Sequence, residues 1–222
     1  NKMPESTSAG MCVSGKGMTD MKIIGITGGV GAGKSQVLEY LRRRQGCRVI
    51  IADQVAHALE EPGGVCLEQI VDLLGQEILT ADGSIDKGKM ASRIFGDEKL
   101  LAQVNGIVHP AVKREICRVI EEERKAGRLR YLFIEAALLI EDGYEQIVDE
   151  MWYIHAKEQI RRQRLKESRH YPDEKIDRIM QGQLSEAEFY RHCPVVIENN
   201  DTMESVYRQI EEKLGEDLWQ KQ

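Results

Sequence analysis

Gly28-Gly29-Val30-Gly31-Ala32-Gly33-Lys34-Ser35 is the stretch of this 222-residue chain that decides its fold. Its spacing, G-x-x-x-x-G-K-[ST], is typical of a phosphate-binding loop, or P-loop. The apolar run before it, residues 21–27, is typical of a buried strand, and residues 36–42 after it place apolar side chains on one face of a helix. The sequence therefore predicts strand, glycine-rich loop and helix in that order. A plain glycine-rich turn with a solvated lysine is the alternative.

This order of elements suits a nucleoside triphosphate. Backbone N–H groups of a curled glycine loop point at phosphate oxygens, and the start of the helix adds the positive end of its dipole. Lys34 can reach the β- and γ-phosphates, and the Ser35 hydroxyl can ligate Mg²⁺. We therefore expect a nucleoside triphosphate and Mg²⁺ as cofactors. The expected nucleotide contacts in the loop are Gly28, Gly29, Val30, Gly31, Ala32, Gly33, Lys34, Ser35 and Gln36.

Length, charge and cysteine content limit the class of protein. The 222 residues suffice for one α/β domain with a smaller insertion. The net charge of −6 argues against a nucleic-acid partner, and no apolar run reaches the length of a membrane span. The five scattered cysteines are typical of reduced thiols in a cytoplasmic protein. We interpret residues 1–20 as a disordered leader or an added expression segment, and the ordered part as a monomer or weak homo-oligomer.

Four further short apolar runs are typical of strands, and helical patterns separate them. None alternates cleanly, which favours strands buried on both faces of a parallel sheet. The predicted fold class is therefore α/β, a doubly wound, mainly parallel five-stranded sheet of the P-loop NTPase type. Ligands of such sheets bind beyond the carboxyl ends of the strands, where Asp53, Glu135 and Asn199 are placed. The predicted strands are residues 21–27, 48–52, 131–134, 151–154 and 195–197.

Two helical regions add to the predicted nucleotide-binding core, which covers residues 21–60 and 128–215. Residues 61–127 have helical periodicity and no strand pattern, so we expect a helical insertion that holds the second substrate. Extra helices packed on the sheet are the alternative. Within the core, residues 157–182 carry a basic helix. Its place beside the expected phosphate crevice favours a mobile lid that brings arginines onto the phosphoryl group, rather than a solvated face.

Three classes of P-loop protein compete. A GTPase needs an N-K-x-D motif after the P-loop, but the one Asn-Lys pair is Asn1-Lys2. A motor or AAA-type ATPase needs more chain and a strand that ends in Asp-Glu, whereas the third predicted strand ends in Glu135 alone. A small-molecule kinase fits a compact chain with a helical insertion and a basic lid. A regulatory module that binds ATP without transfer is a further alternative.

An ordered series of motifs resembles the dephospho-CoA kinase family. The series is Ile26-Thr27 with the P-loop, Val49-Ile50-Ile51-Ala52-Asp53, Gly83-Ser84-Ile85-Asp86, Arg93-Ile94-Phe95, His109-Pro110, Ala137-Leu138-Leu139-Ile140-Glu141 and Val196-Ile197-Glu198-Asn199. The resemblance covers about residues 21–215. This family transfers the γ-phosphoryl group of ATP to the ribose 3′-hydroxyl of dephospho-CoA, so the resemblance implies that small molecule as the acceptor.

The resemblance also implies roles for individual residues. Asp53 matches the family's catalytic aspartate, which accepts the 3′-hydroxyl proton; ordering Mg²⁺ is its alternative role. Lys34 neutralises charge, Arg162 matches the first lid arginine, and Asn199 matches an asparagine near the adenine pocket. His109 is interpreted as structural or acceptor-binding, with proton transfer as the alternative. The expected acceptor contacts are Asp53, Arg93, His109, Glu135 and Leu138.

The chain departs from the family pattern at several positions. Ile51 stands where an acid is usual, and Glu135 stands where Asp is usual. Lys166 stands at the second lid arginine, for which Arg164 or Arg169 are the alternatives, because lysine lacks the forked contact of arginine. These changes concern the lid more than the fold. They leave a kinase of another nucleoside-like or small alcohol acceptor as an alternative function.

Overall fold

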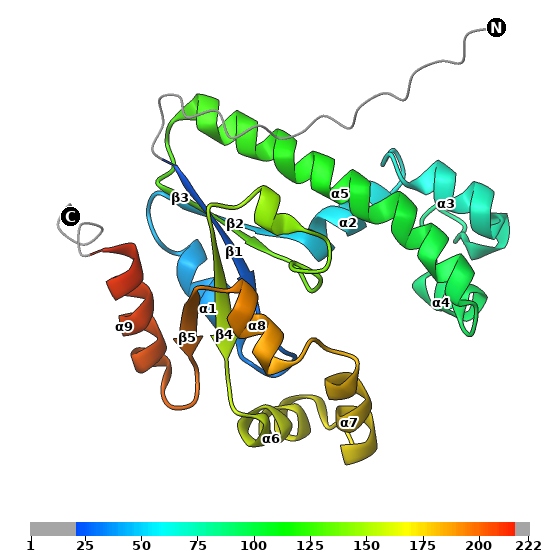
Figure 1. Ribbon diagram of the computed structural model, residues 1–222. Helices are drawn as coiled ribbons and strands as arrows, with labels where there is room; N and C mark the ends of the chain where they lie inside the picture. The colour runs from blue at the N-terminus through cyan, green and yellow to red at the C-terminus, as the bar shows by residue number, and fades with distance from the viewer. Residues whose placement is uncertain (1–20, 216–222) are drawn as a thin grey trace, which may run out of the picture.

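The computed structural model describes residues 21–215, which form one parallel sheet covered by helices (Figure 1). Residues 1–20, interpreted above as a leader, lie outside the described residues. Every neighbouring pair of strands is parallel, so the predicted α/β class and its five strands are confirmed. The strands are β1 (Lys22–Thr27), β2 (Cys47–Ile51), β3 (Tyr131–Glu135), β4 (Glu150–His155) and β5 (Val195–Glu198).

Neighbouring residues of the central strand enter two different cores. Ile23 belongs to the core that α5 (Glu98–Ala126) covers, and Ile24 belongs to the core under α1 (Lys34–Arg42) and α9 (Met203–Leu214). Figure 1 shows α5 on one side of the sheet and α1 with α9 on the other. Because successive strand side chains alternate between faces, both faces need apolar residues. This explains the unbroken apolar runs in the sequence.

The strand order β2-β3-β1-β4-β5 places the P-loop at the centre of the sheet. The chain passes from β1 to one side through β2 and β3, and then to the other side through β4 and β5. Glu135 at the end of β3 pairs in register with Ile51 of β2 and with Ile26 of β1. The carboxyl ends of these three strands therefore meet at one edge, where doubly wound sheets bind ligands.

The predicted insertion, residues 61–127, is helical apart from one isolated antiparallel bridge between Leu79 and Ile85. Its longest helix, α5, begins after Asp97, whose side chain accepts the Leu100 N–H, and ends at Gly127, a left-handed residue. Its function stays a prediction. After α2 (Ala52–Glu60), the elements of this region before α5 are α3 (Leu67–Leu74), η1 (Gln76–Ile78) and α4 (Lys87–Ile94).

The predicted lid, residues 157–182, is a pair of helices at the carboxyl edge of the sheet (Figure 1). They are α6 (Glu158–Arg169) and α7 (Asp173–Gln181). Before the lid, η2 (Tyr144–Gln146) precedes β4, and after it α8 (Glu186–His192) leads into β5. The turn between α6 and α7 uses His170 at φ 52°, a left-handed conformation that a side chain rarely adopts.

The predicted end of the second strand was wrong. Ala52, predicted as the last residue of the second strand, is the first residue of α2. The strand therefore passes directly into a helix, and Asp53 lies in the first turn of that helix, where its negative charge suits the helix dipole. In residues 21–215, no helix has both the length and the apolar character that a membrane crossing requires.

Candidate functional site

The P-loop joins β1 to α1 and has the backbone that its glycines allow. Gly33 has φ 88°, and a Cβ added there would lie 2.2 Å from the Asn199 amide nitrogen. Gly28 has φ 152°, and a Cβ there would lie 2.5 Å from the carbonyl oxygen of Ile154. Both positions therefore require glycine. No described side chain caps the start of α1, so its first N–H groups suit an anion.

Lys34 lies at the centre of the site. Its Nζ donates to the Gly28 carbonyl at 2.6 Å and lies 3.9 Å from Oε1 of Glu135. Burial lowers the pKa of Lys34, and the positive charge of Arg161 lowers it further, while Glu135 and Asp53 oppose this. Burial raises the pKa of Glu135, which Lys34 opposes. This largely buried cation is placed to gain from a polyanionic ligand.

Asp53 differs from its neighbours in being exposed. It lies in the first turn of α2, two residues beyond Ile51, the end of β2 that pairs with Glu135 of β3. Its charge raises the pKa of both Lys34 and Glu135, so the three groups are electrostatic neighbours. The site thus has a buried Lys–Glu pair and an accessible carboxylate beside it. An accessible carboxylate can hold a hydroxyl group and take its proton.

The structure brings two lid arginines to the P-loop, and neither is the predicted Arg162. Arg161 Nε donates to the Val30 carbonyl at 2.9 Å, and Arg164 donates to the Ala32 carbonyl at 3.4 Å. Arg162 instead donates to Glu158 at 2.7 Å and to Asp177 of α7 at 2.5 Å. Residues three apart share a helix face, and Arg162 lies on another face.

Further contacts hold Arg161 beside the P-loop and Lys166 away from it. Gln183, beyond the end of α7, accepts from both Arg161 at 2.5 Å and the Val30 N–H at 3.4 Å. Lys166, at the position of the second lid arginine, forms an ion pair with Asp173 at 2.6 Å. Leu165 is the buried residue of α6, and Arg161 lies one turn before it on the same face. This burial is the sequence signal that could have selected Arg161.

Asn199 is fully buried beneath the P-loop. Its amide nitrogen donates to the Ala32 carbonyl at 2.7 Å, and its amide oxygen accepts from Arg164 at 3.3 Å. The side chain therefore holds the loop to β5 and the lid in this structure. Its predicted contact with the nucleotide stays a prediction.

We expect Asn199→Ala to lower stability, because the substitution removes the closer donor to the buried Ala32 carbonyl and leaves it only the longer contact with Arg164, at 3.4 Å. The cost is about 1–3 kcal/mol. For a domain of this size it corresponds to a melting temperature lower by roughly 3–10 °C. Thermal unfolding followed by circular dichroism measures it. An unchanged melting temperature would contradict the role of Asn199 as a support of the loop.

The predicted acceptor residues occupy two separate places. Glu135 lies beside Lys34, and Leu138 follows it with an exposed side chain. His109 of α5 contacts this same loop, with Nδ1 3.2 Å from Oδ1 of Asp142. Arg93 lies instead at the exposed end of α4, near the start of α5 and away from the sheet (Figure 1). The structure therefore brings three of these residues toward the sheet edge and leaves Arg93 apart.

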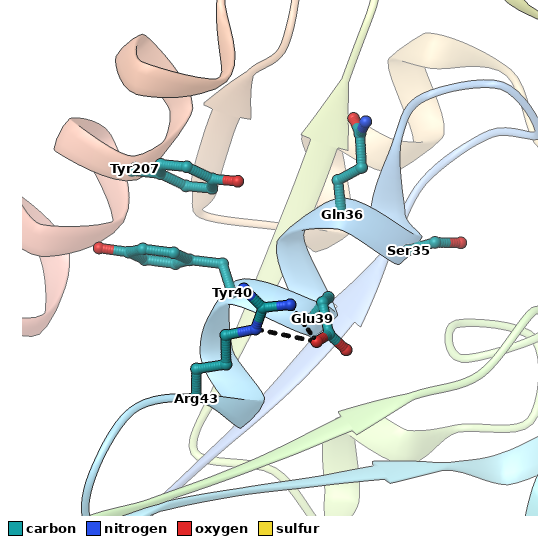
Figure 2. A pocket seen from close by; sticks show the side chains of 6 residues that line it. All are labelled: Ser35, Gln36, Glu39, Tyr40, Arg43 and Tyr207. Carbon is teal, nitrogen blue, oxygen red and sulfur yellow. Dashed lines mark hydrogen bonds and ion pairs between the residues drawn. The ribbon is translucent and has the colours of Figure 1, made fainter.

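Figure 2 shows a groove beside the P-loop that sequence reasoning missed. It has a volume of about 380 Å³ and is lined by Ser35, Gln36, Glu39, Tyr40, Arg43 and Tyr207. Tyr40 and Tyr207 stack with ring centroids 3.9 Å apart and join α1 to α9. Burial and Glu211 raise the pKa of Tyr40 to about 12, so it stays a phenol. Ser35, which is exposed, is shared by this groove and the P-loop.

Comparison with known proteins agrees with the resemblance found in the sequence. The family model described as dephospho-CoA kinase matches residues 22–205. The dephospho-CoA kinase of Corynebacterium diphtheriae is 35% identical over 90% of this chain and 97% of its own length. That of Dehalococcoides mccartyi is 34% identical over 84% of this chain and 92% of its own length.

Solved structures share the fold. A crystal structure of a Thermus thermophilus protein, TT1252, has a TM-score of 0.72 and 28% identity, and the match covers 88% of this chain and 97% of that one. Dephospho-CoA kinase from Campylobacter jejuni has a TM-score of 0.60 and 16% identity over 89% of this chain and 100% of its own. The latter likeness concerns the fold alone. With the family model and the curated relatives, this chain belongs to the dephospho-CoA kinase family.

Proposed function

We propose that this chain transfers the γ-phosphoryl group of ATP to the ribose 3′-hydroxyl of dephospho-CoA, giving coenzyme A and ADP. The observation that carries the proposal is the sheet edge where Lys34 lies between the Gly28 carbonyl and Glu135, with the exposed Asp53 beside them. The site combines a phosphate-binding cation with a carboxylate able to accept a hydroxyl proton. The reaction takes place in the cytoplasm, on a monomer or weak homo-oligomer.

Asp53 accepts the proton of the 3′-hydroxyl group. As it does so, the 3′-oxygen of the acceptor forms a bond to the γ-phosphorus, and the bond from that phosphorus to the bridging oxygen of ADP breaks. The transition state is loose, so the protein contributes mainly position and charge. Lys34, which contacts the Gly28 carbonyl, and Arg161, which contacts the Val30 carbonyl, neutralise negative charge on the phosphates. Lys34 is held in place before ATP arrives, so little reorganisation is needed in the transition state.

The residues at the P-loop fit a Mg²⁺ ion that arrives with the nucleotide. Described residues 21–215 contain no cluster of three His, Cys, Asp or Glu side chains that could hold a metal by themselves. Mg²⁺ usually binds through one or two protein oxygens together with phosphates and waters. The exposed Ser35 hydroxyl would be its direct ligand, with Asp53 as the alternative partner through water. The ion would neutralise phosphate charge.

The helical insertion, residues 61–127, completes the acceptor site in this proposal. His109 of α5 reaches the loop that carries Leu138, through Asp142. The insertion therefore contacts the same sheet edge as the P-loop, and a long acceptor could extend along it. Arg93, which is exposed on α4, would meet the distant phosphates of such an acceptor.

ADP release from Mg-ATP tests the proposed function. We expect dephospho-CoA to stimulate release, with coenzyme A as the product, and expect adenosine, AMP, shikimate and pantothenate to have little effect. A clear response to one of these other alcohols would replace the acceptor. ATP binding without stimulation by any acceptor would favour a regulatory module.

Arg161→Gln and Arg162→Gln form a matched pair of variants. We expect Arg161→Gln to lower kcat/KM for ATP by about 10- to 100-fold, because it removes a charge at the P-loop. Arg162→Gln loses ion pairs within the lid and should lower it by less than about threefold. Steady-state kinetics at saturating acceptor measures both values. The opposite ranking would mean that the lid rotates Arg162 toward ATP during the reaction.

A further inference from the structure

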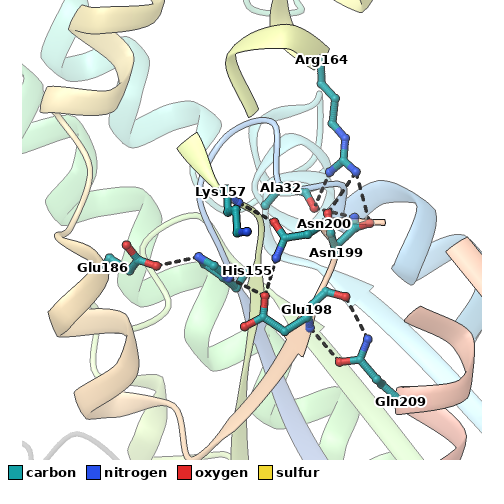
Figure 3. A network of polar contacts seen from close by, with 9 residues as sticks. All are labelled: Ala32, His155, Lys157, Arg164, Glu186, Glu198, Asn199, Asn200 and Gln209. Carbon is teal, nitrogen blue, oxygen red and sulfur yellow. Dashed lines mark hydrogen bonds and ion pairs between the residues drawn. The ribbon is translucent and has the colours of Figure 1, made fainter. Parts of the chain in front are cut away.

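His155, the last residue of β4, is buried and contacts a carboxylate through each ring nitrogen (Figure 3). Nδ1 lies 2.7 Å from Oε2 of Glu198 at the end of β5, and Nε2 lies 2.6 Å from Oε1 of Glu186 at the start of α8. Both contacts are within hydrogen-bond distance, so the ring is held between two carboxyl groups that come from different elements. The rings of Tyr153 and Tyr190 pack beside it.

The contact between His155 and Glu186 joins the two ends of the lid. His155 comes directly before Ala156 and Lys157, through which the chain enters the lid, and Glu186 begins the helix that follows it. Between these points the chain forms α6 and α7. One histidine side chain thus ties the entrance of the lid to its exit. A polar contact at that place limits how far the two ends can separate.

The Glu198 contact extends the tie to the P-loop. Glu198 accepts from the Asn200 side chain at 2.6 Å, and Asn200 in turn accepts from the Lys157 N–H at 2.8 Å. Asn199, between these two residues, donates to the P-loop carbonyl of Ala32. The network in Figure 3 therefore joins the lid entrance, the lid exit and the phosphate-binding loop.

We propose that His155 is a positioning residue that holds the lid in the geometry in which Arg161 and Arg164 face the P-loop. The proposal rests on the proposed nucleotide site, although not on the identity of the acceptor. Loss of the Glu186 contact frees the lid exit and lowers the fraction of molecules with the arginines in place. Apparent ATP affinity falls in proportion to that fraction, whereas turnover at saturating ATP is preserved.

Glu186→Gln tests this proposal, because the Glu186 side chain is 59% exposed and its replacement leaves the contact of the buried His155 with Glu198 intact. We expect the dissociation constant for ATP, measured by calorimetry without acceptor, to rise roughly threefold to tenfold, since a charge-assisted but half-exposed contact is lost. With dephospho-CoA, KM for ATP rises equally and kcat changes by less than about twofold. Glu167→Gln, an exposed glutamate of α6 whose side chain accepts from Gln163, is the control and should match the wild type.

A double-mutant cycle with His155→Gln identifies the partner. If His155 acts through Glu186, the double variant binds ATP no more weakly than His155→Gln alone. Unchanged ATP affinity in Glu186→Gln overturns the proposal, and so does a parallel fall in kcat and melting temperature, which indicates a structural role only. If the wild type binds ATP but does not phosphorylate dephospho-CoA, the proposed acceptor is wrong while the binding test of His155 still stands. If His155→Gln does not fold, Glu186→Gln alone decides the matter.

Discussion

Asp53→Asn is expected to lower the turnover number by a factor of about 10²–10⁴. ATP affinity should change by no more than about twofold. Asparagine has nearly the same size and can still hydrogen-bond the acceptor hydroxyl, but it cannot take a proton at neutral pH. The effect should therefore fall on the chemical step. Calorimetry with ATP and single-turnover kinetics with saturating dephospho-CoA measure the two quantities separately.

The position of Asp53 explains why these two effects should separate. Its carboxylate is exposed in the first turn of α2, whereas Lys34 and Glu135 beside it have only 18% and 13% of their side-chain surface exposed. It can therefore meet an acceptor without rearrangement of the buried pair. Asp72→Asn, at an exposed position on α3, is the matched control and should behave as wild type. Near-normal turnover of Asp53→Asn would rule out the base role.

The dependence on Mg²⁺ distinguishes the two roles of Asp53. A general base leaves the Mg²⁺ concentration for half-maximal activity unchanged, because the ion then depends on Ser35 and the phosphates. A residue that orders Mg²⁺ through water raises this concentration when it is replaced, and excess Mg²⁺ restores part of the activity. Titration of Mg²⁺ at saturating ATP therefore assigns the role.

The fold could be predicted because local patterns determine it. Each strand is an apolar run short enough to cross the sheet once, and helices cover both faces, so the runs stay apolar throughout. The P-loop could be predicted for the same reason, since glycines such as Gly33 occupy backbone positions that exclude a side chain. Ala52 was misplaced because an apolar alanine fits the end of a strand and the start of a helix equally well.

The lid arginines could not be predicted from their charge. Arg161, Arg162 and Arg164 belong to one basic run, and their roles depend on the direction of each side chain around α6. That direction follows from Leu165, which packs inward, so that Arg161, one turn earlier on the same face, also points inward. Arg162 points instead toward the acidic residues of α7. Which arginine of α6 faces the P-loop can therefore be decided only when the positions of the neighbouring elements are known.

The polar network around His155 and Asn199 was also beyond local reasoning. Its contacts join residues distant in the sequence: Asn199 reaches Ala32, and His155 reaches Glu186 and Glu198. A lone histidine at a strand end gives no sign of its partners. Such contacts depend on strand order, which the apolar pattern leaves open because β4 and β5 could follow β1 on either side.

Lys34→Ala is expected to weaken ATP binding and slow the chemical step together. The ammonium lies at the start of α1, within reach of the Gly28 carbonyl and Glu135. Among the described residues, no other cation contacts these two groups. Its loss should lower kcat/KM for ATP by about 10³-fold or more, since both bound phosphates and the transition state lose its charge. Calorimetry should show weaker ATP binding, unlike Asp53→Asn.

Removal of Lys34 also leaves Glu135 without the cation that opposes the rise of its pKa. The variant therefore changes the electrostatics of both members of the Lys34–Glu135 pair. Lys22→Ala is the matched control. Lys22 begins β1, the strand that leads into the P-loop, pairs with Glu150 at 2.6 Å and lies at the opposite edge of the sheet from the P-loop. It should keep wild-type kinetics. Normal ATP affinity and turnover in Lys34→Ala would contradict the assignment of residues 28–35 as the phosphate-binding loop, and with it the proposed direction of transfer from ATP.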